Sequence, residues 1–362
     1  MKRRQAGTCG YRSGAVLAAA VAACAVAGCG SPSETGRGKP VALAPPTRDI
    51  VFRTGVCDKA DPFESGRTAA RAAKDQLGAS PVKAVLVSEC YEDKDRKAKV
   101  LAGVQSVFPK RIVYGGATYG SFTQAGVAVA ESVAVLAVAG RDIDVAAALV
   151  RDMGAKGLTL DEHRAELEGK LHAAGAALAR KLAGTQRARL MIVVADAHSP
   201  KNGALVAGVR GVVGRNFPIT GGCVNKNAGQ TFVYFRGQML PDSAVGLMLS
   251  GDFQVALAGR QAKDNARVIA TARQAAGEAL AELVKHNARP AAAIAFDCAG
   301  RKGKLDDVSD ELAAMQEALG RELPLFGTYN AGEIGPADLA DRQPDVLSSG
   351  VGWHVMFTVL GW

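Results

Sequence analysis

The chain has 362 residues, of which 48% are hydrophobic and 22% are charged. This length is enough for two ordinary domains with a sizeable core. The formal net charge is +9, but four of the basic residues lie in the first twelve positions, and the others are interspersed with acidic residues. A basic balance spread in this way is typical of a solvated surface, so we do not expect the protein to bind nucleic acid.

Residues 1–28 are expected to be a signal peptide and not part of the core. A basic leader precedes an apolar run of small residues, 14–28, which is too short to span a bilayer comfortably. The run ends in the letters VAGC at Cys29, which resembles the lipoprotein box of bacteria. That resemblance implies that Cys29 carries lipid, while a plain secretory signal or a short anchor is the alternative. Because residues 29–49 have the composition of a flexible tether, we expect an exported, membrane-anchored protein of the cell envelope.

Four cysteines remain after the leader and Cys29 are set aside, namely Cys57, Cys90, Cys223 and Cys298. In an oxidising compartment these four could pair in any of three ways, and the sequence does not choose among them. None of them belongs to a CxxC motif or to a Cys/His cluster with zinc spacing. We therefore expect no structural metal and no cofactor.

The mature chain is expected to open with a strand at 49–56 and a helix at 64–77. Three segments then share one pattern, in which an apolar run, an amphipathic helix and a short apolar run closing on glycine follow one another. These glycines are Gly115, Gly221 and Gly327, each 106 residues after the one before. Another apolar run follows each glycine loop.

The repeated elements have the following expected positions. The opening runs lie at 84–90, 190–198 and 291–298, the helices at 95–107, 203–213 and 307–319, and the later runs at 132–140, 243–251 and 352–361. Continuous apolar runs bounded by turns suit strands that are buried on both faces. The first β-α-β of each unit should be a right-handed parallel crossover, and the later strands should return antiparallel.

The predicted fold is therefore α/β (α+β), with three β-α-β-loop-β units of about 106 residues that form mixed sheets flanked by helices. Long Ala-rich helices at 159–182 and 264–285 lie between the units. The second of these helices sets the predicted domain boundary, which separates residues 50–260 from residues 261–362.

Residues 296–336 hold the strongest candidates for a functional site, because two polar, glycine-rich loops lie there at predicted strand ends. Similar loops follow the first two glycines of the repeat. The predicted ligand-binding residues are Gly115, Gly116, Gly221, Gly222, Asn225, Cys298, Arg301, Gly327, Tyr329, Asn330, Gly332 and Glu333. For the glycines and asparagines the alternative is tight turning alone. The loop at 115–120 lacks the glycine spacing and the lysine of a nucleotide-binding motif.

Arg301 and Glu333 have the chemistry to hold the two ends of an amino acid. The guanidinium of Arg301 suits a ligand carboxylate, and the carboxylate of Glu333 suits a ligand ammonium. In the structural alternative, Arg301 is solvated beside its neighbouring lysines, and Glu333 accepts hydrogen bonds from loop N–H groups or pairs with Arg301.

Cys298 is a weak candidate for a nucleophile. A catalytic thiol needs a nearby base that lowers its pKa, and no motif joins Cys298 to His198 or His354. Packing explains a small buried thiol more simply. We therefore do not expect the protein to be an enzyme, and a thiol hydrolase that uses Cys298 is the less favoured alternative.

These loops resemble those of FIST domains, the sensory modules named for F-box and intracellular signal transduction proteins. The letters FDCAGR at 296–301, followed by an apolar strand and GTYNAGEI at 327–334, resemble the C-terminal FIST domain. The glycine loops within 113–126 and 218–240 resemble the N-terminal domain, although the first has Gly120-Ser121-Phe122 where a GEI-like triplet is expected. The similarity runs from about residue 50 to the end.

The resemblance implies a ligand-sensing module for small molecules such as amino acids, with FIST N over 50–260 and FIST C over 261–362. The expected protein is thus a lipid-anchored sensor whose ligand binds at the glycine-rich loops. The sequence does not identify a signalling partner. A protein-interaction scaffold without a small ligand is the main alternative.

Overall fold

The computed structural model describes residues 48–225 and 230–362. The predicted signal peptide, Cys29 and nearly all of the tether lie outside these residues. No helix within the described ranges is long and apolar enough to cross a membrane. Residues 47–362 form one compact unit, so the boundary near residue 260 stays a prediction.

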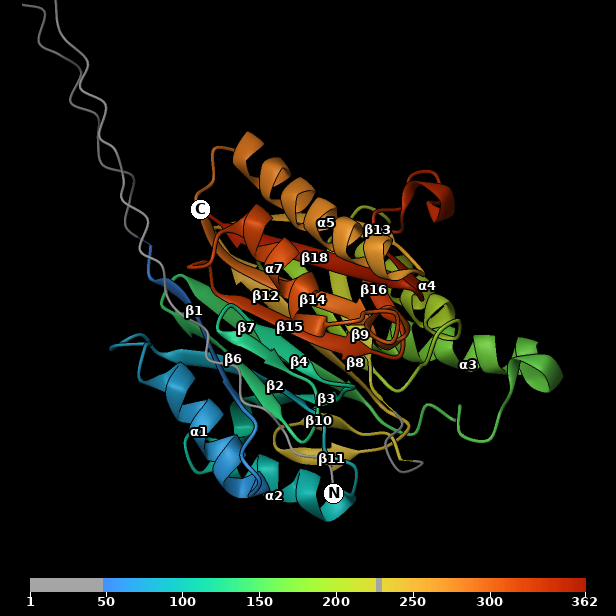
Figure 1. The fold of residues 1–362 in the computed structure, drawn as a ribbon. Coiled ribbons are helices and arrows are strands. Elements are labelled where there is room, and N and C mark those ends of the chain that lie inside the picture. Colours follow the sequence, from blue (N-terminus) through green and yellow to red (C-terminus); the bar gives the residue numbers. More distant parts are fainter. Residues whose placement is uncertain (1–47, 226–229) are drawn as a thin grey trace, which may run out of the picture. The chain divides into compact units, whose positions relative to one another are not determined.

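Three units with the same order of elements follow one another along the chain (Figure 1). The first unit consists of β1 (Ile50–Cys57), α1 (Pro62–Lys74), β2 (Val82–Glu89), α2 (Lys94–Gln105), η1 (Lys110–Ile112), β3 (Val113–Ala117), β4 (Ser121–Thr123), β5 (Gly126–Ala128) and β6 (Val133–Gly140). The second consists of β7 (Ile143–Val150), α3 (Leu160–Arg180), β8 (Ala188–Ala195), α4 (Asn202–Val213), β9 (Ile219–Cys223), β10 (Val233–Phe235), β11 (Gln238–Leu240) and β12 (Ala244–Gly251).

The third unit adds one short helix, α6, to this order. It consists of β13 (Gln254–Gln261), α5 (Asn265–Lys285), β14 (Pro290–Cys298), α6 (Ala299–Lys302), α7 (Val308–Leu319), β15 (Leu325–Asn330), β16 (Glu333–Gly335), η2 (Leu339–Asp341), β17 (Ser349–Val351) and β18 (His354–Gly361). The predicted repeat and the α/β class are therefore confirmed.

Each unit builds most of one six-stranded mixed sheet. The strand orders are β1-β6-β2-β3-β10-β11, β17-β16-β9-β8-β12-β7 and β13-β18-β14-β15-β4-β5. The pairs β2–β3, β8–β9 and β14–β15 are parallel, as predicted, and β6, β12 and β18 return antiparallel.

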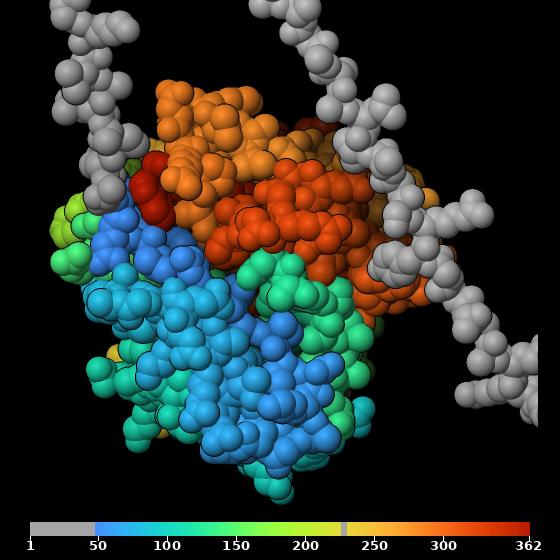
Figure 2. Space-filling view, turned by 60° about the vertical axis from the view of Figure 1, so that its left-hand side comes forward, coloured from blue at the N-terminus to red at the C-terminus, as the bar shows by residue number. Residues whose placement is uncertain are grey.

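The two outermost strands at one edge of every sheet come from a different unit. The hairpin β4–β5 joins the sheet of the third unit, β10–β11 joins that of the first, and β16–β17 joins that of the second. In Figure 2 the green atoms of the first unit lie against the orange atoms of the third, where β4 pairs with β15. This cyclic exchange ties the three units together and brings loops from different units to the same strand ends.

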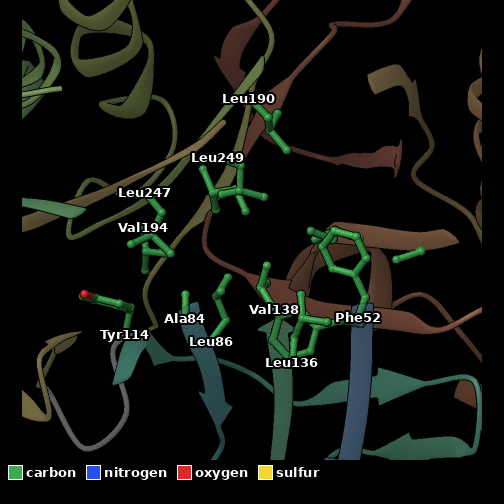
Figure 3. Packing of buried hydrophobic residues seen from close by; sticks show 14 of the residues in the cluster. Phe52, Ala84, Leu86, Tyr114, Leu136, Val138, Leu190, Val194, Leu247 and Leu249 are labelled. Atoms are coloured by element: carbon green, nitrogen blue, oxygen red, sulfur yellow. The ribbon is translucent and has the colours of Figure 1, made fainter. Parts of the chain in front are cut away.

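The central core lies between the three sheets, and it receives one face of each. Figure 3 shows Leu86 and Leu136 of the first unit with Leu247 and Leu249 of the second in this cluster. The other face of every sheet packs under a pair of helices, α1 with α2, α3 with α4, and α5 with α7. Along β8, for example, residues alternate between the two cores, which explains its unbroken apolar sequence.

Glycines allow the paired helices of the first two units to touch backbone to backbone. A Cβ on Gly66 of α1 would lie 2.2 Å from the carbonyl oxygen of Val100, and one on Gly175 of α3 would lie 2.0 Å from that of Leu205. Aspartate caps several helices, as Asp93 does by accepting from the Arg96 N–H at the start of α2.

Candidate functional site

The carboxyl ends of β14 and β15 open onto a cavity of about 580 Å³, which we call the β14–β15 pocket. All three units line it. Tyr119 comes from the first unit and Ser199 from the second, while the third unit supplies the remaining residues, among them Cys298, Gly300, Lys302, Asn330, Gly332 and Trp353. Cavities of this size at strand ends are where small molecules bind in α/β proteins.

Glycines form the walls of the pocket where backbones approach closely. Gly332 has a φ of 144°, and a Cβ there would lie 2.9 Å from the backbone nitrogen of Ser199. A Cβ on Gly352 would lie 2.6 Å from the Ser199 hydroxyl oxygen. The glycine-rich loop is therefore needed for the contact between the second and third units that closes one side of the pocket.

Lys302 is a half-buried cation in the pocket wall. Its Nζ donates to the carbonyl oxygens of Tyr119 at 2.6 Å and Val129 at 3.3 Å, and it lies 5.7 Å from the centroid of the Tyr329 ring. Burial lowers the pKa of Lys302. No ion pair found within residues 48–225 and 230–362 includes this ammonium group, so its charge is not balanced by a carboxylate.

Trp353 stands at the edge of the pocket in a left-handed backbone conformation with a φ of 63°. This conformation is rare for a bulky residue, and such outliers cluster at ligand sites. A Cβ on Gly300 would lie 3.2 Å from the indole ring, so the ring packs directly on that glycine. Lys263 Nζ lies 5.7 Å from the ring centroid. The aromatic residue Trp353 and the cation Lys302 thus line the same cavity.

Arg301 does not reach the pocket, because its guanidinium is fully buried among internal partners. Its Nε donates to Asp297 at 2.8 Å, and its terminal nitrogens donate to Glu311 at 2.9 Å and to the Thr271 hydroxyl at 3.0 Å. Glu311 also accepts from the Tyr329 hydroxyl at 3.1 Å. Although Arg301 is nearby, burial raises the pKa of Asp297 and of Glu311. The network joins β14, α5, α7 and β15.

Glu333 is also fully buried, behind the wall of the pocket. One of its carboxyl oxygens accepts from the backbone N–H of His354 at 3.1 Å, and the thiol of Cys298 is a neighbour of the carboxyl group. Burial raises the pKa of Glu333 well above its ordinary value. The expected clamp between Arg301 and Glu333 is therefore not formed in this structure, since both side chains are enclosed and Arg301 has internal partners.

The Cys298 thiol borders the pocket but is only 8% exposed. Burial, with a contribution from Glu333, raises its pKa to about 12. The ring of His354 is engaged elsewhere, with Nδ1 2.8 Å from the Gly352 carbonyl oxygen and Nε2 accepting from the Asp338 N–H at 3.1 Å. This environment favours the neutral thiol. The four cysteines that could have paired are all free in the structure, namely Cys57, Cys90, Cys223 and Cys298.

The predicted glycines of the first two units lie in the interior, at the junction of the three sheets. Gly115 and Gly116 line a small void of about 20 Å³ together with Asn330, which is too little space for more than one water molecule. A Cβ on Gly222 would lie 2.4 Å from the side chain of Asn330. These glycines therefore permit close packing of the sheets.

The remaining predicted residues are also enclosed. A Cβ on Gly221 would lie 1.9 Å from the Val193 carbonyl oxygen, and Asn225 donates to the Thr118 carbonyl oxygen at 3.3 Å. A Cβ on Gly327 would lie 1.9 Å from the Phe122 ring. Of the predicted set, the structure places Cys298, Asn330 and Gly332 together at the β14–β15 pocket.

Sequence reasoning did not find Tyr119, Ser199 or Trp353, and it named Lys302 only as a neighbour of Arg301. The first two reach the pocket only because units far apart in sequence meet there. Trp353 had one signal, since it follows the glycine that begins the predicted apolar run 352–361.

Comparison with known proteins gives one clear result. The FIST N domain profile matches residues 83–283, and the FIST C domain profile matches residues 252–336. No curated protein matches the sequence significantly. Among solved structures, cyanuric acid hydrolase resembles the chain with 12% identity and a TM-score of 0.41, covering 86% of this chain and 99% of the other.

Two further structures resemble the chain weakly. The cyanuric acid hydrolase of A. caulinodans has 11% identity and a TM-score of 0.43, with 86% and 99% of the two chains covered. The PurLQS structure from Thermotoga maritima has 9% identity and a TM-score of 0.29, with 87% and 73% covered. The FIST N match alone spans more than half of the sequence. The chain therefore belongs to the FIST family of signal-transduction sensory domains.

Proposed function

We propose that this FIST protein senses a small carboxylate, such as an amino acid, that binds in the β14–β15 pocket. The observation that carries the proposal is Lys302, a half-buried ammonium group at the cavity that forms no ion pair with any carboxylate of the described residues. A ligand carboxylate would supply the missing charge through a charge-assisted hydrogen bond. Lys302 thus takes the role that the sequence had suggested for Arg301.

The rest of the pocket suits a ligand with an apolar or aromatic body. The aromatic side chains of Trp353, from the third unit, and Tyr119, from the first, both line it. Gly300 and Gly352 line the cavity without side chains, so a ligand can approach the backbone closely there. Binding without catalysis is part of the proposal, and the raised pKa of Cys298 supports it.

A thermal-shift screen of the full chain tests this function. A ligand that binds only the folded state stabilises it by about 2.7 kcal/mol when its free concentration is about 100 times its dissociation constant. We expect amino acids and other small carboxylates to raise the melting temperature, and the matching decarboxylated amines not to do so. The Lys302→Gln variant should lose the shift, and Lys304→Gln, an exposed neighbour, should keep it.

Two outcomes would count against the proposal. Amines that shift the melting temperature as well as the acids do, or a shift that survives in Lys302→Gln, would remove the role of the ammonium group. If a broad panel of carboxylates gives no shift, the protein-interaction scaffold without a small ligand becomes the better interpretation.

We also propose that the protein is exported and anchored in the membrane through lipid on Cys29. Support comes from the basic leader, the short apolar run and the letters VAGC that end at this residue. In cell fractionation, the wild-type protein should remain with the membranes, and Cys29→Ser should release it or leave it unprocessed. A variant that behaves like the wild type would refute lipid anchoring.

A further inference from the structure

A second cavity, of about 530 Å³, opens at the carboxyl ends of β8 and β9, and we call it the β8–β9 pocket. Its wall includes Asp196 and His198 directly after β8, Thr231 and Phe232 directly before β10, and Asp242 shortly before β12. It is separate from the β14–β15 pocket, with which it shares no lining residue.

The two pockets occupy equivalent places in the second and third units. Ala195 pairs with Cys223 in the parallel pair β8–β9, as Asp297 pairs with Tyr329 in β14–β15, so Asp196 corresponds to Cys298. Thr231 and Phe232 precede β10 as Ala331 and Gly332 precede β16. The repeat has therefore built a cavity twice from the same loops, with different side chains.

The charged side chains that line the β8–β9 pocket are three lysines and two aspartates. Lys94 comes from the start of α2, Lys156 from the loop after β7, and Lys201 from the turn before α4, so three separate segments converge. Lys201 Nζ donates to the Leu158 carbonyl oxygen at 3.1 Å, which holds it in the wall. The ion pairs identified in the described part of the chain include none of these three lysines.

The two acidic residues of the pocket are occupied by other donors. One carboxylate oxygen of Asp196 accepts from the Asp242 N–H at 2.9 Å and from the Thr231 hydroxyl. The carboxylate of Asp242 accepts from the Gly154 N–H at 2.9 Å and the Ala155 N–H at 3.3 Å. These hydrogen bonds fix the loops around the cavity, which the exposed Lys94 and Lys156 and the half-buried Lys201 also line.

We propose that the β8–β9 pocket is a second binding site, for a small oxyanion that carries at least two negative charges, such as a phosphate group. Lysines from three segments that line one cavity can each donate to a different oxygen of such an anion. The β14–β15 pocket, with Lys302 as its cation, suits a single carboxylate, so the two sites would take ligands of different charge. This inference does not depend on what the β14–β15 pocket binds.

Isothermal titration of the full chain with inorganic phosphate at constant ionic strength tests the site. We expect saturable binding, and a loss of about tenfold in affinity for Lys201→Gln, about 1.4 kcal/mol. Lys156→Gln should weaken binding in the same direction. Two controls should bind phosphate as the wild type does, namely Lys99→Gln, an exposed lysine on the same helix as Lys94, and Lys302→Gln in the other pocket.

Several results would overturn the inference. They are the absence of saturable phosphate binding at millimolar concentrations, phosphate binding that Lys201→Gln and Lys156→Gln both leave unchanged, and phosphate binding that Lys302→Gln abolishes. The last result would place the anion in the β14–β15 pocket. Circular dichroism of each variant establishes that a loss of binding does not arise from unfolding.

Discussion

The role of Arg301 can be decided by replacing it with methionine, which keeps most of the length of the side chain and removes its charge. Arg301, Asp297 and Glu311 have side chains that are 0% exposed, so the substitution leaves two carboxyl groups in the interior without their cation. Removing one partner of a buried ion pair costs about 3–5 kcal/mol. Because domains of ordinary stability have about 5–15 kcal/mol in total, Arg301→Met should weaken the fold severely.

Urea unfolding at neutral pH measures this loss of free energy. Arg273→Met is the matched control, since Arg273 pairs with Glu317 on the surface, with side chains 64% and 60% exposed. Exposed pairs contribute about 0–1 kcal/mol, so the control should unfold close to the wild type. If Arg301→Met unfolds as the control does and instead abolishes binding of a small carboxylate, the structural role assigned here is wrong and the ligand role is correct.

The same variant should recover part of its stability in acid. Burial raises the pKa of Asp297 and Glu311 in the folded state, and the loss of the cation raises both values further. The folded variant therefore binds protons that the unfolded chain has released at neutral pH, and its stability increases as the pH falls toward the ordinary carboxyl range. The difference from the wild type should shrink from pH 7 to pH 5.

Three other outcomes are expected. Gly327→Ala should lower the unfolding free energy by about 1–3 kcal/mol, because the new Cβ would lie 1.9 Å from the Phe122 ring. Adding Phe122→Leu to this variant should restore part of the loss, as measured by urea unfolding. The Cys298 thiol, with its pKa of about 12, should react with a disulfide reagent at pH 8 far more slowly in the folded protein than in urea, and equal rates would contradict its burial. Stability should fall as the pH rises above about 4.5, because burial raises the folded-state pKa of Glu333. In urea unfolding between pH 5 and pH 8, Glu333→Gln should flatten this decline. An unchanged slope would contradict the assignment.

The repeat could be predicted because it depends on short-range patterns. A strand buried on both faces gives a continuous apolar run, and the glycine that closes it recurs with a constant spacing. The reason for that glycine differs between units, however. Gly115 and Gly221 have φ values of 136° and 158°, and Gly221 leaves no space for a Cβ beside Val193, whereas Gly327 makes room for the Phe122 ring.

The exchange of hairpins could not be predicted in the same way. Each hairpin strand, such as β4 or β16, has three residues, which is too short for an alternating pattern to identify it or its partner. The pairing of Ser121 with Thr328 joins residues from different units and leaves no local trace. Without that exchange, the sequence cannot place Tyr119 or Ser199 beside Lys302.

Arg301 and Lys302 show the same limit at the level of single side chains. Both follow Cys298 in a short polar turn, and both are basic. The spacing of Asp297 and Arg301 could have suggested an ion pair, but the second partner, Glu311, lies on another helix, and only the fold encloses all three. Adjacent residues on a one-turn helix face different ways, so one is sealed in the core and its neighbour borders the pocket.

The three units also show what buried charges contribute. Lys97, Leu205 and Glu311 occupy the same fourth position in α2, α4 and α7, and they face Glu89, Ala195 and Asp297 at the equivalent ends of β2, β8 and β14. The first unit has a buried Glu89–Lys97 pair at 3.1 Å, the second has only apolar side chains there, and the third has the Arg301 network.

Because the second unit forms the same strands and helices with an apolar pair, the backbone geometry does not require an ion pair at this position. Well-packed apolar groups often replace a buried pair without loss of stability, whereas removing one charged partner is strongly destabilising. A buried ionic network could therefore be replaced as a whole by apolar groups, but once it is present each charged member needs its partners. The enclosed charges of Glu89, Lys97 and Arg301 have internal partners. The lysines that line the two pockets differ from them, because they form no ion pair within the described part of the chain.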